Sequence, residues 1–401
     1  MNNLGREKLL LKNINIYSQT GIINNGFIKL EAGKIAEIGE MADLKSVNVY
    51  GFQELITPKN YTVIPGLIDV HIHGVDGADF MDGTKEALDT MAAALPKEGT
   101  TSFIATTITQ SEEAIANALI NAGEYIENQN NRNQAEVLGV HLEGPFINKK
   151  MSGAQPVQYI IEPNVEIFKK WQELAKNHIK LVTLAPEIDG GIELIGHLKE
   201  TGVIASIGHS DATYEVVIGA IEAGATHATH LFNQMSGLHH REPGVVGAVF
   251  LRKELRVELI ADGIHVKPEI VKLAHKMIGS DRIILITDSM RAKCLKNGSY
   301  DLGGQEVTVQ DGKAVLSNGT LAGSILKLGQ AIKNMMSYTG CTLEDVIRMG
   351  SANPAIQFNA FDKKGSLAVG KDADLVILDE NYDVYMTLCH GTIAYSKGAS
   401  P

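Results

Sequence analysis

Residues 63–74 read VIPGLIDVHIHG, an apolar run that ends in two histidines. Seven comparable runs follow, separated by enough residues for helices, and they read TSFIATTIT (101–109), EVLGVHLEG (136–144), KLVTLAPE (180–187), VIASIGHS (203–210), THATHLFNQM (226–235), RVELIADGIH (256–265) and RIILITDSM (282–290). Alternating strands and helices predict a parallel sheet, and eight such repeats predict that the sheet closes into a (β/α)8 TIM barrel.

Polar side chains are not spread evenly over these runs. In almost every run the apolar residues come first, and the His, Asp or Glu residues gather at the C-terminal end. The active sites of barrel enzymes are built at that end of the strands. A sheet with only a structural role has no reason to repeat this arrangement, so the sequence predicts a functional site at the C-terminal rim.

The two ends of the chain show a different pattern. LLLKNINIYS (9–18) alternates in part, NNGFIKLEAGKIAEIGE (24–40) has glycines at hairpin-like positions, and the chain from about residue 365 again reads as short strands and turns. We therefore predict that residues 1–63 and 356–401 pair into one small β-sandwich domain beside a barrel domain of residues 64–355.

Composition and charge narrow the classes of partner. The 401 residues carry a formal net charge of -11 without any run of Lys or Arg, which argues against nucleic acids and anionic membranes. Cys294, Cys341 and Cys389 are isolated thiols, which predicts a reducing compartment and no disulfide framework. Because the sequence shows neither a signal peptide nor a transmembrane span, we expect a cytoplasmic protein.

The polar residues at the predicted rim include candidate metal ligands. Asp69, His71 and His73 alternate along the first run, so a strand directs all three to one face. Each of the other candidates, taken alone, is more often an ordinary core or surface residue. Together they supply four imidazoles and two carboxylates, the mixture that borderline divalent metals prefer: His71, His73, Glu143, His209, His230 and Asp288.

These positions resemble the amidohydrolase superfamily, in which HxH lies on the first barrel strand, single histidines end the fifth and sixth, and an Asp ends the eighth. The flanking sandwich is part of the resemblance. Many members carry a bridging lysine at the end of the fourth strand, whereas here that strand ends in TLAPE and Lys180 lies at its other end. With Glu143 in that role, and with HLEGPF, LAPE, GHSDA, THLFNQM, ADGIH, TDSM and LAGS, the chain is similar to N-acetylglucosamine-6-phosphate deacetylases.

The resemblance implies a role for each ligand. His71 and His73 bind one ion with Asp288, while His209 and His230 bind a second with the bridging Glu143. One or two ions of Zn, Fe, Mn or Co are expected in each subunit. Asp288 serves as general base and acid in hydrolysis of the N-acetyl group of N-acetyl-D-glucosamine 6-phosphate to D-glucosamine 6-phosphate and acetate, a step of amino-sugar catabolism and cell-wall recycling.

The resemblance also implies a set of substrate-binding residues. Arg241 matches an arginine that reaches the phosphate in the neighbouring subunit, which predicts a homodimer. Gln155 stands where some members carry a histidine. The predicted substrate contacts are Ala154, Gln155, Asn233, Gln234, Arg241, Asp262, Gly263, Ile264, His265, Leu321, Ala322 and Gly323.

Three alternatives remain open. A deacetylase acting on a galactosamine or mannosamine phosphate fits almost as well, and a hydantoinase-type enzyme fits less well because its bridging lysine is missing. A non-catalytic scaffold is disfavoured because every expected ligand is present.

Among the other histidines, His141 lies one layer below Glu143 and can support it, and His227 should face away from His230.

Overall fold

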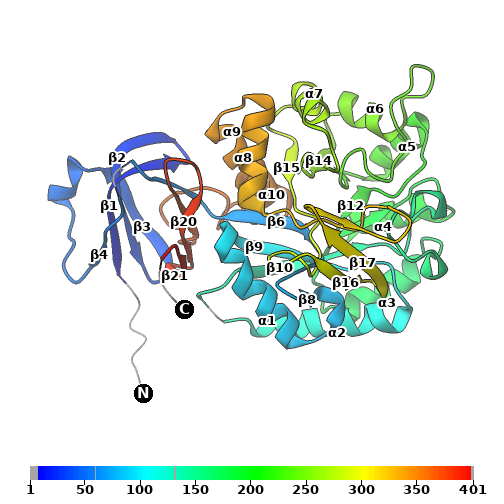
Figure 1. Cartoon of the computed structure of the whole chain (residues 1–401), viewed down its shortest axis with the longest axis horizontal. Coiled ribbons are helices and arrows are strands. Elements are labelled where there is room, and N and C mark those ends of the chain that lie inside the picture. The colour runs from blue at the N-terminus through cyan, green and yellow to red at the C-terminus, as the bar shows by residue number, and fades with distance from the viewer. Residues whose placement is uncertain (1–7, 59, 131, 399–401) are drawn as a thin grey trace.

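The computed structural model describes residues 8–58, 60–130 and 132–398, so the outermost residues of the predicted flanking segments, 1–7 and 399–401, lie outside it. A small sheet made from both ends of the chain stands beside a larger (β/α)8 barrel (Figure 1). The predicted fold class is confirmed.

Eight parallel strands form the barrel, and neighbours along the chain are neighbours in the sheet. The strands are β6 (Leu67–Ile72), β9 (Thr100–Thr106), β10 (Glu136–Glu143), β11 (Ile179–Leu184), β12 (Ile204–Ile207), β13 (His227–Ala228), β14 (Arg256–Leu259) and β15 (Ile283–Leu285). The ring closes beyond β15, where the Asp288 N–H donates to the His71 carbonyl (2.8 Å) and the His73 N–H donates to the Ser289 carbonyl (2.9 Å). Most strand residues are buried because helices cover one face and the packed interior the other.

Each barrel strand is followed by a helix on the outside of the ring. The helices are α1 (Lys85–Ala94), α2 (Glu112–Asn128), α3 (Val165–Leu174), α4 (Gly191–Glu200), α5 (Tyr214–Ala223), α6 (Gly244–Leu251), α7 (Pro268–Ile278) and α8 (Leu328–Thr339). Several begin at a polar cap whose side chain accepts a hydrogen bond from the first turn, as Thr84, Ser111 and Thr213 do. The short helices α9 (Leu343–Ile347) and α10 (Asn353–Gln357), joined by a π-helical turn at Arg348–Ala352, lead back towards the small sheet.

The small domain is one sheet that closes over itself. Its strands run in the order β21 (Thr392–Ser396), β20 (Val384–Cys389), β19 (Leu375–Leu378), β5 (Thr62–Pro65), β1 (Leu9–Ser18), β2 (Gly21–Glu31) and β3 (Lys34–Glu40), with β4 (Gln53–Leu55) also on β1. Within β3, the Ile35 N–H donates to the carbonyl of Lys371 (2.9 Å), which lies just before β19. Both ends of the sheet supply one hydrophobic core. The predicted pairing of the termini is correct, and the two layers of the predicted sandwich belong to a single sheet.

The chain passes directly from the small sheet into the barrel between β5 and β6. Gly66 makes this link, and a Cβ there would lie 2.0 Å from the Thr101 hydroxyl oxygen, so the close approach requires glycine. This short link fixes the small sheet against the first barrel strand.

A three-stranded antiparallel sheet is inserted between β15 and α8, and lies in front of the barrel strands in Figure 1. It consists of β16 (Gly298–Leu302), β17 (Gln305–Gln310) and β18 (Lys313–Val315). The Gln305 amide donates to the Ala154 carbonyl (2.6 Å), and the Gln110 amide donates to the Gly303 carbonyl (3.0 Å). These bonds tie the insertion to two loops at the C-terminal ends of the barrel strands.

Two further observations concern the helices and the cysteines. Among the helices of the described residues, none combines the length and the apolar composition needed to cross a membrane. Cys294, Cys341 and Cys389 are free thiols.

Candidate metal centre and substrate pocket

The six predicted ligands converge at the C-terminal rim of the barrel. His71 and His73 lie at the end of β6, Glu143 ends β10, and the other three follow β12, β13 and β15. All are buried, with Asp288 the most accessible at 9%. Two groups can each hold an ion, because one ligand atom from every member lies within 4.8 Å of the others: His71, His73 and Asp288, and Glu143, His209 and His230. We call these six residues the metal centre.

Glu143 stands between the two groups. Its Oε1 lies 3.4 Å from His71 Nε2, 3.2 Å from His209 Nε2 and 3.1 Å from His230 Nε2. Its Oε2 lies 3.4 Å from His73 Nε2. This position between all four imidazoles is the one expected of a carboxylate shared by two ions, and the bridging role stays a prediction.

The arrangement fits a divalent metal because its inward-facing ring nitrogens meet carboxylate oxygens and one another, and one of them, His71 Nε2, makes no hydrogen bond. His71 Nε2 is buried and makes no hydrogen bond, although oxygens of Glu143 and Asp288 lie 3.4 and 3.5 Å from it. A buried polar atom without a partner costs about 1–3 kcal/mol, which a cation at this point would offset. The His209 and His230 Nε2 atoms face each other at 3.1 Å, as two ligands of one ion do. Mixed nitrogen and oxygen donors suit Zn, Fe, Mn or Co.

Backbone strain directs three of the ligands inward. His209, His230 and Asp288 have φ values of 49°, 29° and 48°, a left-handed region that residues other than glycine seldom occupy. Each lies just beyond the end of its strand, where the turned backbone carries the side chain across the mouth of the barrel. Strain of this kind is concentrated at functional sites.

The electrostatics of the metal centre favour bound positive charge. Burial would raise the pKa of Glu143, but the charge of His71 and hydrogen bonds from His209 and His230 hold it well below its ordinary value. Burial would likewise raise the pKa of Asp288, but His71 and His73 lower it, so both carboxylates are ionised at neutral pH. Burial would lower the pKa of His71, and the surrounding carboxylates raise it well above 6.5, so the centre attracts a proton where no ion balances it.

A cavity of about 320 Å³ opens directly above the metal centre. His73, Glu143, His209, His230 and Asp288 form part of its wall. The predicted substrate contacts that line it are Ala154, Gln155, Asn233, Gln234, His265, Leu321 and Gly323. Ile108, Gly153, Leu302 and Thr320 also line it and were not predicted.

The remaining predicted substrate residues lie outside this lining. Asp262 accepts hydrogen bonds from the His265 ring (2.7 Å) and the Ile264 N–H (2.8 Å), so it shapes the loop that presents His265. Ala322 is buried in the core beneath the inserted sheet. Arg241 is exposed on the loop after β13, where its guanidinium contacts His240 Nε2 at 2.8 Å.

Gln155 contacts the central carboxylate of the site. It is 5% exposed, its side-chain amide donates to Glu143 Oε2 (2.8 Å), and its carbonyl oxygen accepts from the Thr109 N–H (2.7 Å). Gln155 therefore fixes the carboxylate oxygen that faces His73.

A sequence model of the family described as the amidohydrolase family matches residues 62–394. The chain belongs to the amidohydrolase family. The predicted resemblance is thus confirmed.

Relatives with named activities are similar over most of this amidohydrolase. An N-acetylglucosamine-6-phosphate deacetylase of Bacillus subtilis (strain 168) is 48% identical over 390 residues, covering 97% of this chain and 98% of that protein. An N-acetylgalactosamine-6-phosphate deacetylase of Escherichia coli O157:H7 is 38% identical over 330 residues, covering 82% and 87%. The solved structure of a mutant N-acetyl-D-glucosamine-6-phosphate deacetylase from Mycobacterium smegmatis, in complex with N-acetyl-D-glucosamine-6-phosphate, matches with a TM-score of 0.90 at 28% identity, covering 97% of this chain and 100% of that one.

The sequence did not reveal the buried carboxylate that contacts the predicted ligand His71. Glu258 lies on β14, is fully buried, and contacts His71 and His227. The available signal was an acidic residue inside the otherwise apolar run RVELIADGIH. His141 lies beside His71, with ring centroids 4.6 Å apart, and its Nε2 contacts the Thr183 hydroxyl at 2.7 Å, which agrees with the predicted deeper layer.

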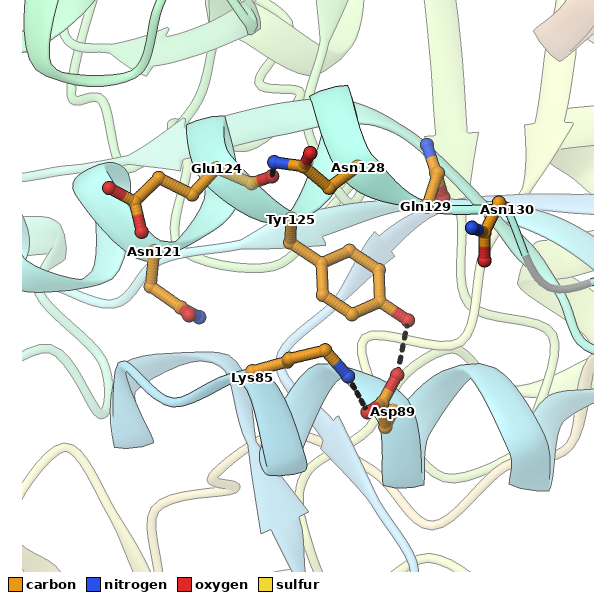
Figure 2. Close-up of a pocket in the computed structure, with 8 residues that line it drawn as sticks. All are labelled: Lys85, Asp89, Asn121, Glu124, Tyr125, Asn128, Gln129 and Asn130. Atoms are coloured by element: carbon orange, nitrogen blue, oxygen red, sulfur yellow. Dashed lines mark hydrogen bonds and ion pairs between the residues drawn. The ribbon is translucent and has the colours of Figure 1, made fainter.

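A second hollow of this amidohydrolase, about 290 Å³, lies on the outside of the barrel between α1 and α2 (Figure 2). Tyr125 donates to Asp89 (3.0 Å), and Lys85 pairs with the same carboxylate. Lys85 and Asp89 thus satisfy each other away from the strand ends, and we assign the hollow no chemistry.

Proposed function

We propose that this amidohydrolase removes the acetyl group of N-acetyl-D-glucosamine 6-phosphate to give D-glucosamine 6-phosphate and acetate. The observation that carries the proposal is the metal centre at the floor of a cavity lined by polar side chains. The similarity to the Bacillus subtilis deacetylase over nearly the whole chain supports the same substrate. We place the reaction in amino-sugar catabolism and cell-wall recycling.

The two ligand groups would hold one or two divalent ions, with Zn, Fe, Mn and Co as the candidates. A bound ion supplies a Lewis acid for the acetyl carbonyl and lowers the pKa of a coordinated water from 15.7 to about 7. Asp288 is ionised and borders the cavity, so it can accept the proton of the attacking water and return it to the departing amine. Gln155 and the imidazoles keep Glu143 in place during this transfer.

Polar residues of the cavity wall outside the metal centre are suited to binding the sugar. Asn233 and Gln234 follow the ligand His230 and line the cavity. Burial would lower the pKa of His265, but its hydrogen bond to Asp262 and the charge of that carboxylate raise it, which favours a protonated ring that can donate to a hydroxyl or phosphate oxygen. These groups position the substrate so that its acetyl group faces Asp288.

Acetate release from a panel of substrates tests the proposal. We expect the highest kcat/KM with N-acetylglucosamine 6-phosphate, lower values with the galactosamine and mannosamine analogues, and little turnover of unphosphorylated N-acetylglucosamine. The 38% identical galactosamine relative makes the galactosamine analogue the second candidate. A higher kcat/KM with that analogue would assign the enzyme to it instead.

We also propose that the enzyme is a cytoplasmic homodimer in which Arg241 contacts the phosphate held by the neighbouring subunit. Its exposure away from the cavity of its own chain supports a role between subunits. Arg241→Ala should lower kcat/KM for the phosphorylated sugar about 10–150-fold, because a charge-assisted hydrogen bond contributes roughly 1.5–3 kcal/mol. The unphosphorylated sugar and the control Arg252→Ala should show little change, and equal losses on both sugars would make Arg241 structural.

A further inference from the structure

Glu258 links the two groups of the metal centre from below. Its Oε2 accepts the His71 Nδ1 proton (2.8 Å) and also the backbone N–H of His230 (3.1 Å). Its Oε1 contacts His227 Nε2 at 3.2 Å. The side chain is fully buried, and these three bonds leave it one position in the barrel interior.

The first of these bonds decides which nitrogen of His71 can bind a metal. Because the ionised carboxylate of Glu258 can only accept, Nδ1 is the protonated nitrogen, and in the neutral ring that binds a metal the lone pair lies on Nε2. That Nε2 is the buried atom without a hydrogen-bond partner, and it points between Glu143 and Asp288. A carboxylate behind a ligating histidine also makes the ring a better electron donor.

The second bond acts on the other group. His230 has a φ of 29°, which is strained for a residue with a side chain, and its N–H is held by Glu258. The turned backbone brings His230 Nε2 to 3.1 Å from both Glu143 Oε1 and His209 Nε2. One carboxylate therefore orients the ring of one ligand and the backbone of another.

We propose that Glu258 is a positioning residue that sets the tautomer of His71 and the backbone of His230, and so controls the affinity of the metal centre for its ions. The inference rests on the proposed metal-dependent function. Glu258 itself touches neither the cavity nor the reacting atoms.

The test measures zinc affinity directly. Metal-free wild type and Glu258→Gln compete with a chromogenic chelator for Zn²⁺. Gln keeps the size and some hydrogen bonds but removes the charge, so zinc binding should weaken about 10–100-fold, as for other partners of ligating residues. Added zinc should restore part of the acetate release, which it would not do for a misfolded chain.

Glu98→Gln is the matched control, because Glu98 is also a buried carboxylate but pairs with Lys293 (2.9 Å) and not with any of the six residues of the metal centre. It should bind zinc like wild type. Should Glu258→Gln fail to fold, Glu258→Asp keeps the charge but withdraws it from His71, and should weaken zinc binding by less.

Wild-type zinc affinity in the Glu258 variants, or an equal loss in Glu98→Gln, would overturn the proposal. A wild type that releases no acetate would defeat the proposed function, while the zinc comparison would still decide the role of Glu258.

Discussion

Two clusters of carboxylates and imidazoles in this amidohydrolase differ in the source of their positive charge. The junction cluster lies between the barrel and the small sheet and consists of Glu136, Lys364, Asp372, Asp374 and His390. Lys364 Nζ lies 2.6 Å from Glu136, 2.6 Å from Asp374 and 3.3 Å from Asp372. In the metal centre, by contrast, neither Glu143 nor Asp288 pairs with a lysine or arginine of the described residues.

The spacing of ligand atoms does not separate these clusters, because Glu136, Asp372 and His390 can also hold an ion by geometry alone. What separates them is whether the protein fills the site itself. Buried carboxylates need a cation, and an internal lysine satisfies that need in the junction cluster. The carboxylates of the metal centre have no such lysine among the described residues, so an ion from solution would have to supply the positive charge. This difference is the one expected between a structural cluster and a reactive site.

Removing metal should have the largest effect and should act on one cluster only. Dialysis against a chelator should abolish acetate release, because the metal centre loses its Lewis acid, and Zn, Fe, Mn or Co should restore part of it. The junction cluster carries its own cation, so the secondary structure seen by circular dichroism should remain. Full activity in protein shown by elemental analysis to be metal-free would contradict the assignment.

Asp288→Asn should have the next largest effect. The amide keeps the size of the side chain but cannot accept a proton, and general acid–base catalysis is typically worth about 10²–10⁴-fold, so kcat should fall at least that far. Steady-state kinetics at saturating substrate measure the loss, with a thermal melt to show that the fold survives. A variant with nearly wild-type kcat would show that another group is the base.

Lys364→Met should damage the junction cluster and spare the metal centre. The substitution keeps the length of the side chain but leaves the buried Asp374 and its acidic neighbours without their cation, and breaking such pairs costs about 3–5 kcal/mol. Urea unfolding should show this loss, while kcat per folded molecule stays unchanged. Lys397→Met, which breaks the exposed pair with Asp379, is the control and should cost no more than about 1 kcal/mol. A fall in kcat that matches the loss of stability would mean that the clusters are coupled.

The smallest effect concerns the pH dependence of the junction cluster. Burial would raise the pKa of Glu136, but the hydrogen bond from His390 and the charge of Lys364 lower it from 4.5 to about 2. A carboxyl group whose pKa is lowered by folding stabilises the folded state when the pH is above its ordinary pKa of 4.5. This contribution disappears as the pH falls from about 4.5 to about 2. The difference in unfolding free energy between wild type and Glu136→Gln should therefore shrink over that range. A difference independent of pH would remove Glu136 from the network.

The sequence by itself determined the barrel, the position of its rim and the convergence there of the six predicted ligands. The apolar runs specify buried strands because a parallel sheet is covered on both faces. Since the C-terminal ends of such strands meet at one rim, polar residues at those ends come together whatever the details of packing. The proximity of residues as far apart in the chain as His71 and Asp288 is thus predictable from local patterns alone.

Only the tertiary structure decided which buried groups support these ligands and which stand apart. Glu258 pairs with His71 across 187 positions, and neither neighbouring sequence marks the pair. Lys364 is one of many lysines in the sequence, and its burial among three carboxylates follows from how the small sheet packs against the barrel. The physical reason is that periodicity fixes the face of a strand on which a side chain lies, whereas the partner it meets depends on distances set by the packing of the whole chain.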